Sequence, residues 1–110
     1  MLNQVILVGR LVEDPKLVEL ESGKTTSVIT LAVSRGFKNQ SGEYETDFIH
    51  CVLWQGVAES TQQYCSKGSI IGVKGRIAVR NIEIGDGKKF KHNDIVAEKV
   101  TFISPKKKED

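Results

Sequence analysis

The stretch that decides the fold is FIHCVLW, residues 48–54. Successive side chains of a β-strand point to opposite faces of the sheet, and this stretch separates cleanly when it is read that way. Ile49, Cys51 and Leu53 are small and apolar, which suits a core. The other face carries aromatic and polar side chains: Phe48, His50, Val52 and Trp54. A face of this kind suits a platform on which nucleobases stack.

Further strands are predicted on both sides of residues 47–54. Four more segments combine apolar side chains with the period of a strand: 3–12, 26–34, 69–80 and 93–103. Glycines interrupt the first and the third of these segments at Gly9, Gly72 and Gly75. Glycine inside a strand predicts a bend or a bulge, so we expect curved strands.

The connections are predicted from turn residues and from one helical pattern. Residues 16–20 form a short edge segment between two turns, and residues 35–46 form a long polar loop. A hairpin loop is expected over 81–91, around a Gly-Asp-Gly turn. Residues 57–67 have one apolar side and precede Gly68, which predicts a helix. Three strands, one helix and two strands match the OB fold, a five-stranded Greek-key barrel in an otherwise all-β chain.

Length and composition limit the class of protein. The chain has 110 residues, with 39% hydrophobic and 27% charged residues, which suits one soluble domain. We expect the domain to span residues 1–104 and a charged, disordered tail to span 105–110. No apolar run is long enough for a membrane helix. Residues 1–4 show neither a basic region nor a small-residue cleavage site, so we expect no signal peptide. We therefore expect a cytoplasmic protein in which Cys51 and Cys65 are free thiols.

Cationic residues accompany the aromatic face. On the fourth long strand, Lys74, Arg76 and Arg80 lie on the side opposite Ile71 and Val73. The first strand and the loops add further cations and two rings: Arg10, Arg35, Phe37, Lys38, Lys88, Lys89, Phe90 and Lys91. Cations follow the phosphates of single-stranded nucleic acid, and rings stack on its bases whatever the sequence. The pattern therefore predicts such a ligand, although the formal net charge is only +2.

The aromatic face is also compatible with roles that involve no nucleic acid. Trp54 also fits a place in the core, and exposed rings also serve subunit interfaces. The first strand is apolar on both sides, whereas a barrel needs only one apolar face. We therefore expect Ile6 and Val8, together with Ile49, to contact another subunit. An RNA-binding OB module and an interaction domain that binds no nucleic acid are the rival functions.

Catalytic and metal-binding patterns are absent from the sequence. His50 and Cys51 are neighbours in one strand and point to opposite faces, and no Cys-x-x-Cys or His-x-x-x-His spacing accompanies Cys65 and His92. The glycine-bearing segment 72–75 lacks the spacing of a phosphate-binding loop. We expect no metal, no cofactor and no enzymatic activity.

The segments together resemble the bacterial single-stranded DNA-binding protein family over nearly the whole chain. The matching pieces are NQVILVGRL (3–11) with Asp14-Pro15, TLAVS (30–34), TDFIHCVLW (46–54), Ala58-Glu59, Tyr64, KGS (67–69) and GRI (75–77). Each piece alone is modest, but their order and spacing are specific. The resemblance implies an OB fold and homotetramers around which DNA wraps during replication, recombination and repair. It also implies a location at the nucleoid.

The resemblance assigns roles to individual residues. The stacking rings of the family match Phe37, Phe48 and Trp54. A further ring is usual at the position of Ile82, and Phe90, across the hairpin, is the candidate to replace it. The basic positions of the family match Arg10, Lys38, Lys67, Arg76 and Arg80.

The end of the chain departs from the family. Members usually continue into a disordered linker rich in Gly, Pro and Gln, and then into an acidic tip that docks partner proteins. This chain instead ends in KKKED, residues 106–110. We therefore expect a naturally short paralogue or a trimmed chain, and no protein partners recruited through an acidic tip.

Overall fold

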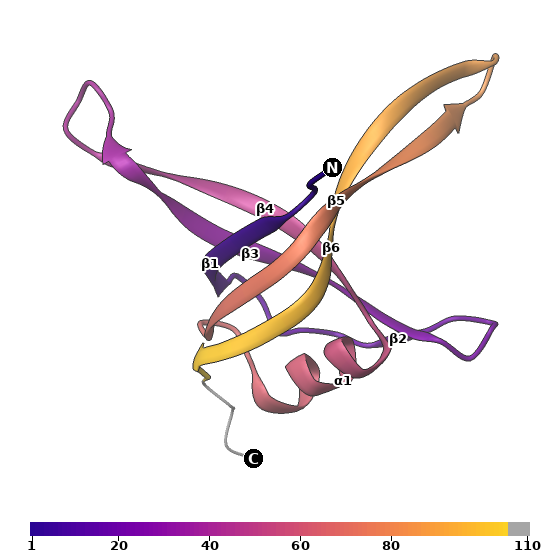
Figure 1. The fold of residues 1–110 in the computed structure, drawn as a ribbon, viewed down its shortest axis with the longest axis horizontal. Coiled ribbons are helices and arrows are strands. Elements are labelled where there is room, and N and C mark those ends of the chain that lie inside the picture. The colour runs from indigo at the N-terminus through magenta and orange to yellow at the C-terminus, as the bar shows by residue number, and fades with distance from the viewer. Residues whose placement is uncertain (106–110) are drawn as a thin grey trace.

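A computed structural model describes residues 1–105 (Figure 1). The secondary structure is that of an all-β chain with one short helix. In chain order the elements are β1 (Val5–Leu11), β2 (Val18–Glu19), β3 (Thr25–Lys38), β4 (Tyr44–Trp54), α1 (Gln55–Tyr64), β5 (Ile70–Ile84) and β6 (Lys88–Ser104). Apart from Pro105, the expected tail of residues 105–110 lies outside the described residues.

Five of the strands close into a barrel. They pair in the order β1-β5-β6-β4-β3, and β1 also pairs with β3, which closes the ring. The β4–β6 contact is parallel, with Cys51 opposite Ile95 and Val52 opposite Val96, and every other pairing is antiparallel. The two-residue β2 pairs with β3 only and lies outside the ring. This closed, mixed barrel confirms the predicted OB fold.

Two glycines allow barrel strands to approach closely. A Cβ atom on Gly75 would lie 2.1 Å from the carbonyl oxygen of Val96, and one on Gly9 would lie 2.9 Å from that of Ala32. At Gly75 the pairing with β6 also slips by one residue, because Lys74 pairs with Lys99 while Gly75 pairs with Ala97. The slip is a β-bulge, which confirms the irregularity that glycine predicted in this strand.

The core lies inside the barrel, and α1 covers one end of it (Figure 1). Ile49, Cys51 and Leu53 of β4 face this core, and Ala58 and Thr61 of α1 are buried against it. The ten buried hydrophobic residues among those described are Leu11, Ile29, Leu31, Cys51, Leu53, Ala58, Cys65, Ile71, Val73 and Ala97. Cys51 and Cys65 are both buried and form no disulfide with each other. Burial raises the pKa of the Cys51 thiol to about 11.

Two loops are much shorter than the sequence predicted. Residues 35–46 and 81–91 mostly continue their strands, so that two long hairpins, the β3–β4 arm and the β5–β6 arm, project beyond the barrel (Figure 1). The turns are short and have the expected chemistry: Asp86 and Gly87 both have positive φ, and Gly42 has φ +79°. These strands escaped prediction because an arm is exposed on both faces, so its sequence carries no alternation between apolar and polar residues.

The helix also differs from its predicted range of 57–67. It begins at Gln55, directly after β4, and ends at Tyr64, where Cys65 returns to an extended conformation and is buried. Gln55 has φ +52°, so the chain turns sharply after Trp54. None of the helices in the described part of the chain has the length and hydrophobicity needed to cross a membrane.

Candidate nucleic-acid interface

The outer face of β4 carries the predicted platform. Phe48 is 65% exposed and Trp54 39% exposed, so Trp54 is not enclosed in the core. His50 lies between them on the same face, and its Nδ1 lies 3.0 Å from Thr30 Oγ1 on the neighbouring strand. The alternation predicted for residues 48–54 is confirmed.

An open cavity of about 360 Å³ lies beside Trp54 where the barrel meets the β5–β6 arm. Apolar side chains dominate its wall, and two charged side chains, Arg80 and Asp94, join them. The lining residues are Leu20, Thr26, Val28, Val52, Trp54, Ala78, Arg80, Asp94 and Val96. We call this the Trp54 cavity. Its apolar wall and single ring suit the flat, unstacked base of a single strand.

One face of the β5–β6 arm continues this cavity outward. Ala78 lies opposite Asp94 in the ladder, and both line the cavity. The pairs that follow on the same face, two residues at a time, are Arg80 with His92, Ile82 with Phe90, and Ile84 with Lys88. We call this run the arm face. It places Phe90, 46% exposed, on the same continuous surface as Trp54.

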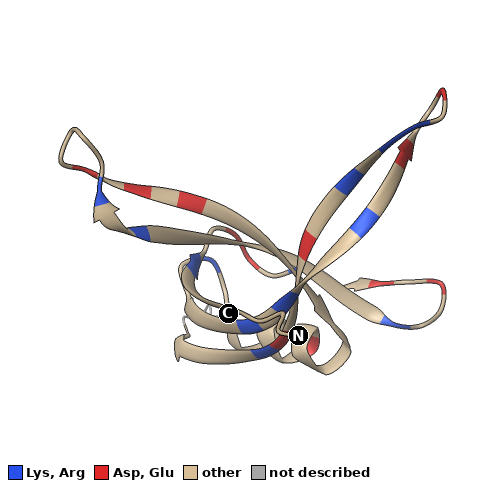
Figure 2. Cartoon of the chain, turned by 45° about the horizontal axis from the view of Figure 1, so that its top comes forward, with Lys and Arg blue, Asp and Glu red and all other residues tan. Residues whose placement is uncertain are grey.

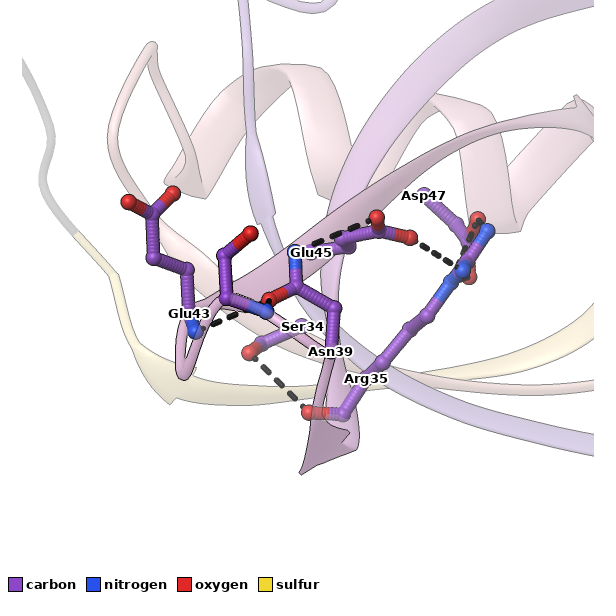
Figure 3. Close-up of polar contacts among 7 residues, drawn as sticks. Ser34, Arg35, Asn39, Glu43, Glu45 and Asp47 are labelled. Atoms are coloured by element: carbon purple, nitrogen blue, oxygen red, sulfur yellow. Dashed lines mark hydrogen bonds and ion pairs between the residues drawn. The ribbon is translucent and has the colours of Figure 1, made fainter.

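The β3–β4 arm is charged differently. Figure 2 shows acidic bands along β4 of this arm and several basic bands along the β5–β6 arm. Arg35 forms ion pairs with Glu45 and with Asp47, whose Oδ1 lies 2.9 Å from Nη2 of Arg35 (Figure 3). The hydrogen bond from Arg35 lowers the pKa of Asp47, and the same bond raises the pKa of Arg35. Two exposed carboxylates thus accompany the one guanidinium.

Comparison with known proteins identifies the family. The profile of the Single-strand binding protein family matches residues 2–103. Single-stranded DNA-binding protein B of Bacillus subtilis is 47% identical over 109 residues, which cover 99% of this chain and 96% of that protein. Single-stranded DNA-binding protein 2 of Listeria monocytogenes is 48% identical over 106 residues, which cover 96% of this chain and 66% of that protein.

The chain belongs to the single-strand binding protein family. Membership places it among binding proteins rather than enzymes. A third relative, the Single-stranded DNA-binding protein of Bacillus cereus, is 48% identical over 106 residues, but this chain spans only 62% of its length.

Two rings near the tip of the β3–β4 arm are exposed. Phe37 is 68% exposed, beside a slip in the pairing between Ser34 and Lys38. Lys38 lies opposite Tyr44 in the ladder, with Nζ 5.8 Å from the centre of its ring. Tyr44 is 58% exposed. We did not predict it as a site residue from the sequence, because an irregular loop was expected there. A ring inside a polar stretch of the sequence, between Glu43 and Glu45, was the available sign.

Besides Arg35 and Lys38 of the β3–β4 arm and Lys74, the predicted cations fall into three groups. Arg76, opposite Val96, and Arg80 adjoin the Trp54 cavity, and Lys88 lies on the arm face. Lys89 and Lys91 lie on the reverse face of the same arm, since they alternate with Lys88 and Phe90. Arg10 and Lys67 lie at the connection from α1 to β5, where Arg10 Nη1 donates to the carbonyl of Gly68 at 3.0 Å.

The last predicted cation, Lys74, adjoins the predicted subunit contact. Lys74 lies opposite Ile6 and helps to line an open cavity of about 310 Å³ with Ile6 and Val8. Ile6 is 71% and Val8 54% exposed, so this side of β1 is uncovered in the single chain. Ile49 instead packs partly buried against the core. We therefore leave Ile49 out of the proposed contact.

Proposed function

We propose that the protein binds single-stranded DNA without regard to sequence and keeps it unpaired and protected during replication, recombination or repair. The observation that carries the proposal is the continuous exposed surface from Phe48 through the Trp54 cavity to Phe90, with Arg76 and Arg80 beside it. The names of the relatives support DNA as the ligand. The proposed place of action is the nucleoid in the cytoplasm, where single strands arise.

Binding rests on two kinds of contact. Bases stack on Phe48, Trp54 and Phe90, with Phe37 as a further ring at the tip of the other arm. Stacking of this kind contributes about 1–3 kcal/mol per base and tolerates any sequence, because every base has a flat face. No covalent bond is made or broken.

Phosphates meet the cations that flank these rings. Arg76, Arg80 and Lys88 flank the same surface as Trp54 and Phe90, and we propose them as the central contacts. Lys89 and Lys91 contact the phosphates of DNA that passes along the reverse face of the β5–β6 arm. We propose Arg10, Lys38, Lys67 and Lys74 as contacts along the outer part of the path. Arg35 is left out, because Glu45 and Asp47 already balance its charge.

Titration of the protein with oligo-dT tests the proposal. Trp54 is the one tryptophan of the chain, so any quenching of tryptophan fluorescence reports on this ring. We expect strong quenching, and an affinity that falls with salt because binding releases counterions. Trp54→Ala, followed with a labelled oligonucleotide, should lose about 10-fold or more in affinity. Tyr64→Leu, on α1, is the matched control and should bind like the wild type.

Two results would contradict the proposal. Tighter binding to oligo-U or to structured RNA than to oligo-dT would favour an RNA-binding module. The absence of both binding and quenching would favour an interaction domain that binds no nucleic acid.

We also propose that the protein forms homotetramers. The support comes from the uncovered apolar side of β1, where Ile6, Val8 and Ile103 are each more than half exposed. A second copy that covers this side would bury apolar area that a lone barrel leaves in water. Ile6→Lys should therefore lower the mass measured by light scattering, whereas Glu13→Lys should not. A wild-type mass equal to that of one chain would refute the proposal.

A further inference from the structure

Asp94 is an acidic residue in the middle of the proposed DNA surface. Its side chain is only 13% exposed, and it holds two basic side chains on the arm face. Arg80 binds it through Nε and through Nη2, the latter 3.2 Å from Oδ1, and His92 Nε2 lies 3.1 Å from the same oxygen. A carboxylate at a DNA surface normally repels phosphate, so Asp94 is out of place here unless it serves another side chain.

Relative exposure shows which group a ligand would meet. The side chain of Arg80 is 61% exposed, whereas that of Asp94 is 13% exposed. An approaching DNA strand therefore meets the guanidinium and not the carboxylate. Asp94 is engaged by Nε and Nη2, and within residues 1–105 no side chain takes Nη1. That nitrogen is left for a phosphate oxygen at the rim of the Trp54 cavity.

The Arg35 cluster shows the opposite arrangement. There the carboxylates of Glu45 and Asp47 are 48% and 47% exposed, and the Arg35 side chain is 41% exposed. An approaching phosphate would meet two exposed negative charges beside one positive charge. The two Arg–Asp pairs therefore have the same chemistry and opposite consequences for an anionic ligand.

We propose that Asp94 is a positioning residue for DNA binding, which holds Arg80 at the rim of the Trp54 cavity so that its free side meets the phosphate next to a base on Trp54. This inference rests on the proposed function. Arginine is long and flexible, and ordering it during binding costs free energy. Asp94 orders it beforehand. The carboxylate contacts Arg80 and His92 and has no contact of its own with DNA.

The test compares two substitutions that change the charge identically. Asp94→Asn should weaken binding to oligo-dT by about fivefold, even though it removes a negative charge, because Arg80 is no longer fixed. The salt dependence should become less steep by roughly 0.7 in slope, the value expected for one phosphate contact on a single strand. Asp47→Asn, the matched control, should bind as tightly as the wild type or more tightly.

A double-mutant cycle separates positioning from a merely structural role. On an Arg80→Gln background, Asp94→Asn should cause no further loss, because the side chain that it positions is gone. Asp94→Glu keeps a carboxylate and should bind with most of the affinity of the wild type. This second variant still tests the inference if Asp94→Asn folds poorly. Thermal unfolding of each variant checks that the barrel is intact.

Three outcomes would overturn the inference. They are tighter binding by Asp94→Asn, an equal loss on the Arg80→Gln background, and an equal loss in Asp47→Asn. Each of these leaves the proposed function intact, because the wild type still binds oligo-dT. A wild type that does not bind oligo-dT would instead refute the proposed function and this inference together.

Discussion

Ile82 lies directly opposite Phe90 in the antiparallel ladder of β5 and β6. Residues opposite each other in such a ladder share one face, with Cβ atoms about 5 Å apart. The family resemblance led us to expect a ring at position 82, and the chain has isoleucine there. The ladder therefore provides a ring at almost the same place from the partner strand, on the face that continues to Trp54.

Substitutions at these two positions test whether Phe90 replaces the ring expected at position 82. Phe90→Ala should weaken binding to oligo-dT by about 10-fold, the loss of one stacked base. Adding Ile82→Tyr to this variant should restore the affinity, because the new ring lies on the same face. Val79→Ala, on the reverse face of the arm, should have no effect in the same titration. A double variant that binds no better than Phe90→Ala would contradict the idea.

Asp47 should titrate at a lower pH than an ordinary aspartate. Its pKa is lowered mainly by the hydrogen bond from Arg35. The folded pKa is below the unfolded one, so the pair stabilises the arm above the ordinary pKa of aspartate and loses this effect as the pH falls through the folded value. Titration by NMR measures the pKa directly, and Arg35→Gln should return it to the ordinary range. An unshifted pKa in the wild type would show that the pair does not persist in solution.

Gly75→Ala should destabilise the barrel. The added methyl group would lie 2.1 Å from the carbonyl oxygen of Val96, so the backbones of β5 and β6 must separate. We expect a loss of about 3 kcal/mol in the free energy of unfolding, measured with urea. Gly85→Ala is the matched control, because a Cβ there meets no described atom within 4 Å and its effect should be small. Equal losses in the two variants would argue against the close approach at Gly75.

Cys51 should be protected from thiol reagents while the barrel is folded. Burial raises its pKa to about 11, so very little thiolate is present at neutral pH, and the sulfur is inaccessible. In the unfolded chain the thiol ionises nearer its ordinary value of 9.0. Stability from the neutral thiol is therefore present below that value and is lost as the pH rises toward 11.

Urea unfolding across this pH range measures the effect. The stability difference between wild type and Cys51→Ala should shrink as the pH rises from about 8 to about 10.5. Rapid labelling of Cys51 in the folded protein would contradict its burial.

Sequence patterns predicted the parts of the molecule in which one face meets the core. Residues 48–54 alternate because the barrel interior selects one face and the solvent selects the other. The arms lack that constraint on both faces, so residues 35–46 were mistaken for a loop. The sequence also could not predict which residues lie opposite each other on neighbouring strands. Asp94 gave no sign of its contact with Arg80, because only the register of β5 and β6 brings the two together.

Barrel closure has a consequence for synthesis of the protein. The parallel β4–β6 contact joins Cys51 and Val52 to Ile95 and Val96, which are far apart in the chain. β6 also supplies the partner for the whole length of β5, so the ring cannot close until β6 has left the ribosome. Until then the inward residues of β1, β3 and β4 are open to water and to other nascent chains. Chaperone capture of this protein during its translation should therefore peak just before β6 emerges.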